Sequence, residues 1–144
     1  MQTTWIVTAD ASRARILQVA GRERLVEIAA LANPAGRLQN REINADAAGR
    51  FRGPDRPGGH ASDDENRAAD HQAELFAGQI GEALDKARTE QRFAQLYLVA
   101  PPKFLGALRR KLGRETQKLV VDELDKDLSW FDQRSLEGYL ARQN

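Results

Sequence analysis

The fold is decided by the stretch Leu96-Tyr97-Leu98-Val99-Ala100-Pro101-Pro102. An almost entirely apolar run of this length is typical of a central strand that is buried on both faces of a sheet. Proline is tolerated in the first turn of a helix, so Pro102 is predicted to open a helix that ends at Gly113. Strands followed by crossover helices build parallel sheets, and the stretch therefore predicts an α/β fold.

The first third of the chain predicts an antiparallel meander of three strands. Residues 4–9 are rich in β-branched and aromatic side chains, and Asp10-Ala11-Ser12 then supplies turn chemistry. A second strand over residues 15–19 stops at Gly21, and a third occupies residues 25–31.

Residues 33–61 predict a long loop, because Gly, Pro, Asn, Arg and Asp leave no helical or strand period there. Loops longer than about 12 to 15 residues are uncommon in compact domains and are often functional. Ser62-Asp63-Asp64-Glu65 has the pattern of a capping box, which predicts the start of a helix with three acids in its first turn. Apolar positions at helical spacing extend this helix to about Arg88.

The end of the chain predicts a fifth strand over residues 117–124 and a closing helix over residues 132–141. We therefore expect one domain over residues 1–144 with a mixed sheet of about five strands, in which a meander is followed by an α-β-α-β-α order.

Composition restricts the class of protein. With 41% hydrophobic and 30% charged residues among 144, the chain is globular in character, and no run approaches the length of about 18 apolar residues that a membrane span needs. The amino terminus lacks the pattern of a signal peptide, so a cytoplasmic location is expected. The absence of cysteine excludes disulfides and sulfur-ligated zinc.

No familiar catalytic signature occurs, whether a phosphate-binding loop, a dinucleotide fingerprint, a zinc-protease motif or a serine-hydrolase elbow. The sequence favours a protein without enzymatic activity, and we expect no cofactor and no metal. His60 is the one candidate catalytic residue, as a proton shuttle in the long loop. His71, at the border of an apolar helical stripe, is expected to be a hydrogen-bonded boundary residue.

Cations gather on one side of the helix that follows Pro102. Residues 101–118 hold six cations and one acid, a net charge of +5, whereas residues 62–90 hold eight acids and three cations, a net charge of −5. We therefore expect a molecule with one basic and one acidic side. Opposite the core-facing Leu105, Leu108 and Leu112, a basic stripe is expected from Lys103, Ala107, Arg110 and Arg114, flanked by Arg109 and Lys111.

The stripe has two interpretations that the sequence leaves open. Clustered cations bind the phosphates of RNA by releasing condensed counterions, but cations also suit the carboxyl end of a helix dipole on an ordinary solvated face. The same choice applies to the arginines of the long loop. The predicted contacts to ribosomal RNA or tRNA are Lys103, Arg109, Arg110 and Arg114, with Arg50 and Arg52 from the loop.

Three stretches, residues 4–16, 99–109 and 123–128, carry a family resemblance, and Pro101-Pro102-Lys103-Phe104-Leu105-Gly106 is its most specific part. The chain resembles, over nearly its whole length, the bacterial family called host attachment protein, required for attachment to host cells. Residues 46–51 look like a looser form of a loop motif of that family.

That family in turn looks like the central domain of archaeal and eukaryotic peptide-chain release factors, which implies an α/β fold of this strand order. In those factors a Gly-Gly-Gln loop before a long helix positions water at the peptidyl-tRNA ester, and Gly58-Gly59-His60 stands in a similar place here, with histidine for glutamine. The resemblance implies three hypotheses: a cytoplasmic, non-enzymatic RNA- or ribosome-associated factor with an indirect effect on attachment, a hydrolase of a peptidyl-tRNA-like ester, or a protein-binding adaptor.

Overall fold

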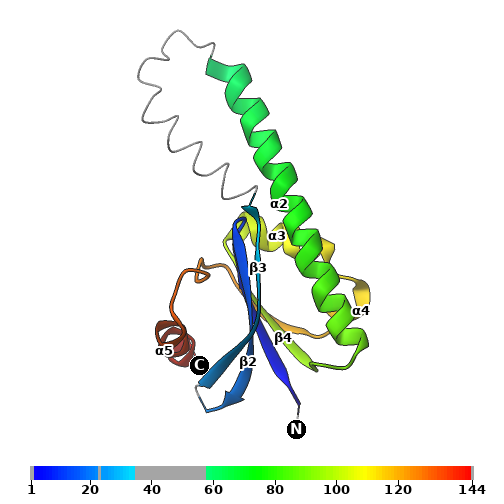
Figure 1. Ribbon diagram of the computed structural model, residues 1–144, viewed down its shortest axis with the longest axis vertical. Coiled ribbons are helices and arrows are strands. Elements are labelled where there is room, and N and C mark those ends of the chain that lie inside the picture. Colours follow the sequence, from blue (N-terminus) through cyan, green and yellow to red (C-terminus); the bar gives the residue numbers. More distant parts are fainter. Residues whose placement is uncertain (1, 23, 35–57, 144) are drawn as a thin grey trace.

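The chain folds into one mixed five-stranded sheet, as expected, and helices lie on both of its faces (Figure 1). A computed structural model describes residues 2–22, 24–34 and 58–143; of residues 58–65, 142 and 143 it describes the backbone alone. The strand order is β3-β2-β1-β4-β5. Both the fold class and the antiparallel meander followed by parallel strands are confirmed.

The meander consists of β1 (Thr4–Ala9), β2 (Arg13–Gly21) and β3 (Arg24–Ala32). β2 pairs antiparallel with both neighbours. The β1–β2 turn closes with a hydrogen bond of 2.8 Å from the amide of Asp10 to the carbonyl of Arg13. β1 lies at the centre of the sheet, since its other side pairs in parallel with β4.

β4 (Gln95–Val99) is flanked by β1 and β5 (Val120–Leu124) and runs parallel to both. Leu96, Leu98 and Val99 are buried, which confirms the prediction of a central strand. The fifth strand begins three residues later than predicted, because Arg114–Gln117 form the short helix α4.

The cause of α4 lies far away in the chain. The carboxylate of Asp85 accepts hydrogen bonds from the amide of Gly113, at 3.2 Å, and from the hydroxyl of Thr116. Asp85 thus caps the amino end of α4 from a neighbouring helix. No local signal in residues 113–117 reveals such a cap.

Helix α2 (Gly58–Thr89) ends one residue beyond the predicted position but begins four residues before Ser62. The predicted capping box is therefore inside the helix, and the predicted acids are absent from its first turn. Residues 58–61 of the predicted loop are helical, while residues 35–57 lie outside the described part. The helix is stabilised mainly where its apolar face packs, so a local capping pattern does not determine where it begins.

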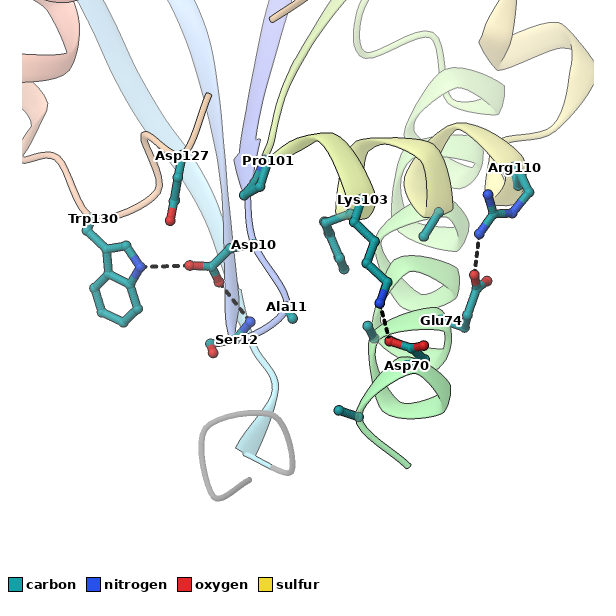
Figure 2. Close-up of a pocket in the computed structure, with 14 residues that line it drawn as sticks. Asp10, Ala11, Ser12, Asp70, Glu74, Pro101, Lys103, Arg110, Asp127 and Trp130 are labelled. Atoms are coloured by element: carbon teal, nitrogen blue, oxygen red, sulfur yellow. Dashed lines mark hydrogen bonds and ion pairs between the residues drawn. The ribbon is translucent and has the colours of Figure 1, made fainter. Parts of the chain in front are cut away.

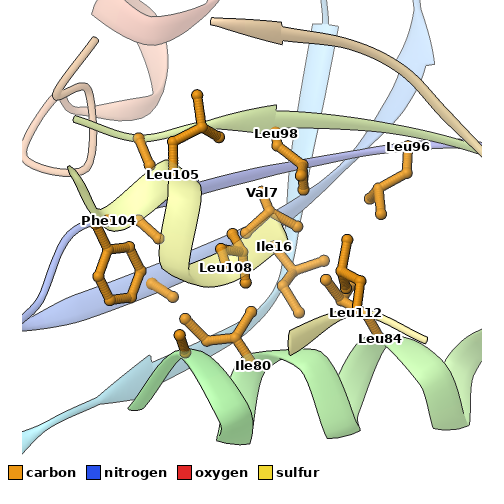
Figure 3. Close-up of a cluster of buried hydrophobic side chains, with 14 of the residues drawn as sticks. Val7, Ile16, Ile80, Leu84, Leu96, Leu98, Phe104, Leu105, Leu108 and Leu112 are labelled. Carbon is orange, nitrogen blue, oxygen red and sulfur yellow. The ribbon is translucent and has the colours of Figure 1, made fainter. Parts of the chain in front are cut away.

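Helices α2 and α3 (Pro102–Lys111) cover one face of the sheet and pack against each other, while the amino-terminal half of α2 extends beyond the sheet (Figure 1). Figure 3 shows the core between these two helices and the sheet. It is built from side chains of both helices and of the odd positions of β1. The predicted apolar faces are confirmed except at Ala83, which is only partly buried. The other predicted positions are all buried: Phe76, Ile80, Leu84, Ala87, Leu105, Leu108 and Leu112.

The opposite face of the sheet is covered in part by α5 (Gln133–Gln143), which Asp132 caps through a hydrogen bond of 2.7 Å from the amide of Ser135. This bond lowers the pKa of the Asp132 carboxyl. Leu136 is fully buried against a second apolar cluster that includes Ile6 and Leu17. Among the described residues, no helix has the length and apolar character needed to span a bilayer.

Candidate functional site

A pocket of about 640 Å³ opens where β1, β4 and β5 end, and we call it the strand-end pocket (Figure 2). Asp10 follows β1, Pro101 follows β4 and Asp127 follows β5. Helices α2 and α3 supply the opposite wall. In α/β sheets the carboxyl ends of parallel strands are the usual place for ligands, and the volume is within the range of ligand pockets.

Asp10 organises the first wall of the pocket. Its Oδ1 accepts hydrogen bonds from the amides of Ser12, at 2.7 Å, and Arg13, at 2.9 Å. Its Oδ2 accepts from the hydroxyl of Ser129, at 2.9 Å, and from the indole Nε1 of Trp130, at 2.7 Å. Three N–H donors and the hydroxyl of Ser129 surround this carboxylate, so Asp10 holds the wall together.

The loop after β5 is fixed by further polar contacts. Asp127 Oδ1 lies 2.9 Å from the hydroxyl of the fully buried Ser129, whose one proton is available to either Asp127 or Asp10. Arg15, itself buried, donates to the carbonyl of Phe131 and forms a 2.6 Å ion pair with Glu27. These contacts tie the loop to Asp10, just after β1, and to Arg15 of β2, which Glu27 of β3 holds in place.

Trp130 is the most exposed large hydrophobic side chain among the described residues, at 57%. Its indole N–H is bonded to Asp10, and the guanidinium of Arg13 lies 4.4 Å from the centre of its ring. A cation at this distance is attracted to the ring face. Trp130 is therefore both exposed and held in one orientation.

The second wall is built from ion pairs between α2 and α3. Lys103 Nζ lies 2.7 Å from Asp70 Oδ1, and Arg110 is hydrogen-bonded to Glu74. Lys111 Nζ lies 3.7 Å from the other oxygen of Glu74. The hydrogen bond from Arg110 is the largest cause of the lowered pKa of the Glu74 carboxyl.

The floor between the walls is apolar. Phe104 and Ala107 are each 5% exposed, and the ring of Phe104 packs 6.1 Å from that of Phe76. Four carboxylates and two cations line the pocket, which gives the lining a net charge of −2. The remaining apolar lining residues are Ala11, Ala69, Ala73 and Pro101.

The basic stripe differs from the prediction because α2 packs against it. Ala107, expected on the outward side, is buried. The reason is that α3, which follows Pro101-Pro102, packs against α2 as well as against the sheet. Asp70 and Glu74 of α2 pair with Lys103, Arg110 and Lys111 of α3, so at this contact the predicted basic residues lie beside acids. Arg109 instead pairs with Glu123 of β5, and Arg114 is exposed and forms no ion pair with the described residues.

The family model described as protein required for attachment to host cells matches residues 5–140. The chain belongs to this family. No curated protein matches the chain. The family match confirms the resemblance, while the similarity to release factors stays a prediction.

The stretches by which the chain resembles the host attachment family meet at one place in the structure. Residues 4–16 supply Asp10 and Ser12, residues 99–109 supply Pro101 and the start of α3, and residues 123–128 supply Asp127. All three contribute lining residues to the strand-end pocket, which makes it the first candidate for the functional site of this family member.

Several predicted site residues are not brought into the pocket. Lys103 and Arg110 line it, whereas Arg109 and Arg114 do not. Arg50, Arg52 and the side chain of His60 lie outside the described part, and the backbone of His60 is in the first turn of α2. His71 is exposed rather than at a boundary, and no group of metal-ligating side chains is found among the described residues.

The pocket contains residues that sequence reasoning missed. Asp10 was assigned to turn chemistry alone, and Asp127 and Trp130 were given no role. Their position after the ends of β1 and β5 is the signal that was available, because the ends of parallel strands converge.

Proposed function

We propose that this host attachment family member is a protein-binding adaptor whose contact surface is the strand-end pocket and its rim residue Trp130. The observation that carries this proposal is the exposed and oriented indole of Trp130. Tryptophan is enriched among the residues that dominate binding energy at protein interfaces. A ring already fixed by Asp10 and Arg13 loses little conformational freedom when a partner covers it.

The charges favour a protein over RNA as the occupant of the pocket. Lys103 and Arg110 are already paired with carboxylates, and the lining carries more acid than base. A phosphate entering the pocket would meet four carboxylates. A role as a cytoplasmic RNA- or ribosome-associated factor stays a prediction that depends on Arg114, Arg50 and Arg52, and hydrolysis stays a prediction that depends on His60.

The description of the family concerns attachment to host cells. An adaptor contributes to attachment by joining other proteins, without contacting the host itself. This indirect role is compatible with the cytoplasmic location that the sequence predicts.

Photo-crosslinking at a pocket residue tests the proposal. A photoreactive amino acid replaces Ala69 in the full chain in cells, and a matched protein carries it at Val121, an exposed residue of β5 outside the pocket. We expect a discrete protein adduct from position 69 that is absent from position 121 and disappears in the Trp130→Ala background. Adducts with RNA at position 69, or protein adducts indifferent to Trp130→Ala, would contradict the proposal.

A further inference from the structure

We infer that the partner inserts an arginine side chain into the strand-end pocket, and this inference rests on the adaptor function proposed above. The pocket offers what an arginine needs: an apolar floor for the stem, carboxylates for the guanidinium and an aromatic ring beside them. These features are supplied by α2, by α3 and by the loop after β5.

The carboxylates stand on both sides of the pocket. Figure 2 shows Asp127 beside Trp130 on one side, and Asp70 and Glu74 with their cations on the other. Within the part of the chain that the structure describes, Asp127 uses only its Oδ1 as an acceptor. Its Oδ2 is thus available to an entering donor, unlike the oxygens of Asp10.

The pairing of Asp70 is easily exchanged. The side chains of Lys103 and Asp70 are 82% and 51% exposed. Exposed ion pairs contribute only about 0 to 1 kcal/mol, so Asp70 can turn to a second cation at little cost. A guanidinium presents five donors in a planar fork, which allows it to bind more than one carboxylate oxygen.

The floor and the indole suit the rest of the side chain. Ala73, Phe104 and Ala107 lie where the aliphatic stem would pack, and small alanine side chains leave room for it. One guanidinium, that of Arg13, already lies 4.4 Å from the centre of the Trp130 ring. The exposed remainder of the ring offers the same kind of contact to a guanidinium from outside.

Arginine is favoured over an acidic or phosphorylated segment because the net charge of the lining is −2. Complementary charge mainly raises the association rate and the specificity, and like charges brought together are costly. The pocket therefore selects a basic segment of a partner protein.

Titration of the full wild-type chain with short peptides tests the inference. The probe is acetyl-Ala-Arg-Arg-Ala-amide, and its matched control carries citrulline, which has nearly the shape of arginine without its charge. The reporter is the indole N–H signal of Trp130 in nuclear magnetic resonance spectra, together with the amides of Ala69 and Ala73. We expect saturable shifts below about 5 mM peptide, and binding of the citrulline peptide weaker by about tenfold.

Variants assign the binding to the pocket. Asp127→Asn is expected to weaken the binding of the arginine peptide by about fivefold, and Asp70→Asn is expected to weaken it by a smaller factor. Asp125→Asn removes an exposed carboxylate outside the pocket and is expected to leave the affinity unchanged. If Asp127→Asn disturbs the fold, the spectrum of that variant will show it. The effect of Asp70→Asn on peptide affinity then decides whether the peptide binds in the pocket.

The alternative outcomes separate the two proposals. Equal binding of the arginine and citrulline peptides, or shifts from an acidic peptide alone, would overturn the choice of arginine while leaving protein binding in place. Saturable shifts of the same signals by a single-stranded RNA oligonucleotide would overturn both proposals. The absence of any peptide shift would overturn the arginine inference, and the crosslinking result at position 69 then decides the adaptor function.

Discussion

Two fully buried threonines differ in what their hydroxyls contact. Among the described residues, the hydroxyl of Thr8 is buried without a hydrogen-bond partner. We expect Thr8→Val to raise the free energy of unfolding by about 1 kcal/mol, because valine has the same shape and removes an unsatisfied polar group. Urea denaturation monitored by circular dichroism measures the change.

Thr116 supplies the matched control. Its hydroxyl donates to Asp85 and accepts from Arg88 Nε at 3.1 Å. The same exchange, Thr116→Val, is expected to lower the free energy of unfolding by about 1 to 3 kcal/mol, since two charged groups lose a partner. Equal effects at the two positions would show that the hydrogen bonds do not distinguish them.

At this scale, sequence patterns predicted which residues are buried better than which residues touch. The burial of Leu105, Leu108 and Leu112 was predictable because it follows from the regular spacing of side chains along a single helix. The pairing of Lys103 with Asp70 was not, because it requires knowing that α2 and α3 pack together. Trp130 escaped notice for a related reason, since its partner Asp10 is at the other end of the chain.

The packing of α2 on α3 depends on a glycine. A Cβ added to Gly81 would lie 2.7 Å from the carbonyl oxygen of Lys111, which is too close for real atoms. Alanine is a better helix former by about 1 kcal/mol, but forcing two backbones apart costs more. We expect Gly81→Ala to lower the free energy of unfolding by about 1 to 2 kcal/mol in a denaturant titration.

One turn earlier, Gly78 tests the same helix without the close approach. Its added Cβ would lie 3.9 Å from a flexible side-chain carbon of Lys111. Gly78→Ala is expected to be neutral or to raise the free energy of unfolding by up to about 1 kcal/mol. Destabilisation of equal size at both glycines would contradict a specific contact at Gly81.

The ion pair between Glu74 and Arg110 should make the stability of the α2–α3 contact depend on pH. The pKa of Glu74 is lowered from its ordinary value of 4.5, mainly by the hydrogen bond from Arg110. A carboxyl with a depressed folded-state pKa stabilises the fold above its unfolded value, and this stability is lost as the pH falls through the folded-state pKa.

Glu74→Gln is therefore expected to reduce the free energy of unfolding at pH 7 and to differ less from the parent at pH 3, where more of the Glu74 carboxyl is protonated. The difference should be within the range of about 0 to 1 kcal/mol found for exposed pairs, and salt should shrink it. Urea titrations of both proteins at the two pH values measure it. A difference that persists at low pH would assign the effect to packing instead of charge.

Most elements could be predicted, and the failures have a common cause. The strands were predictable from alternation and apolar runs, and α3 from Pro102 and its leucines. The start of α2 was not, because the local capping pattern lies inside the helix, and the existence of α4 was not, because the distant carboxylate of Asp85 caps it. The pocket could be located only in outline, from the rule that parallel strand ends converge.

For the whole molecule, the distribution of charge is the property that separates the functional hypotheses. The chain has a formal net charge of +1, and the basic α3 lies beside the acidic α2. Opposite charges in contact largely cancel each other's field, and salt screens what remains beyond about one Debye length, roughly 8 to 10 Å. A polyanion approaching this side therefore meets little attraction from Lys103 or Arg110.

Removing the acids should restore that attraction. The double variant Asp70→Asn and Glu74→Gln frees Lys103, Arg110 and Lys111 and is expected to elute from a heparin column at a clearly higher salt concentration than the parent protein. The matched control, Glu82→Gln with Asp125→Asn, makes the same change in net charge at exposed positions outside the pocket, and should shift elution less. If the parent already needs high salt, the pairs do not neutralise the stripe, and RNA becomes the better supported partner. If both double variants shift equally, only net charge matters, and the α2–α3 surface has no special part in binding polyanions.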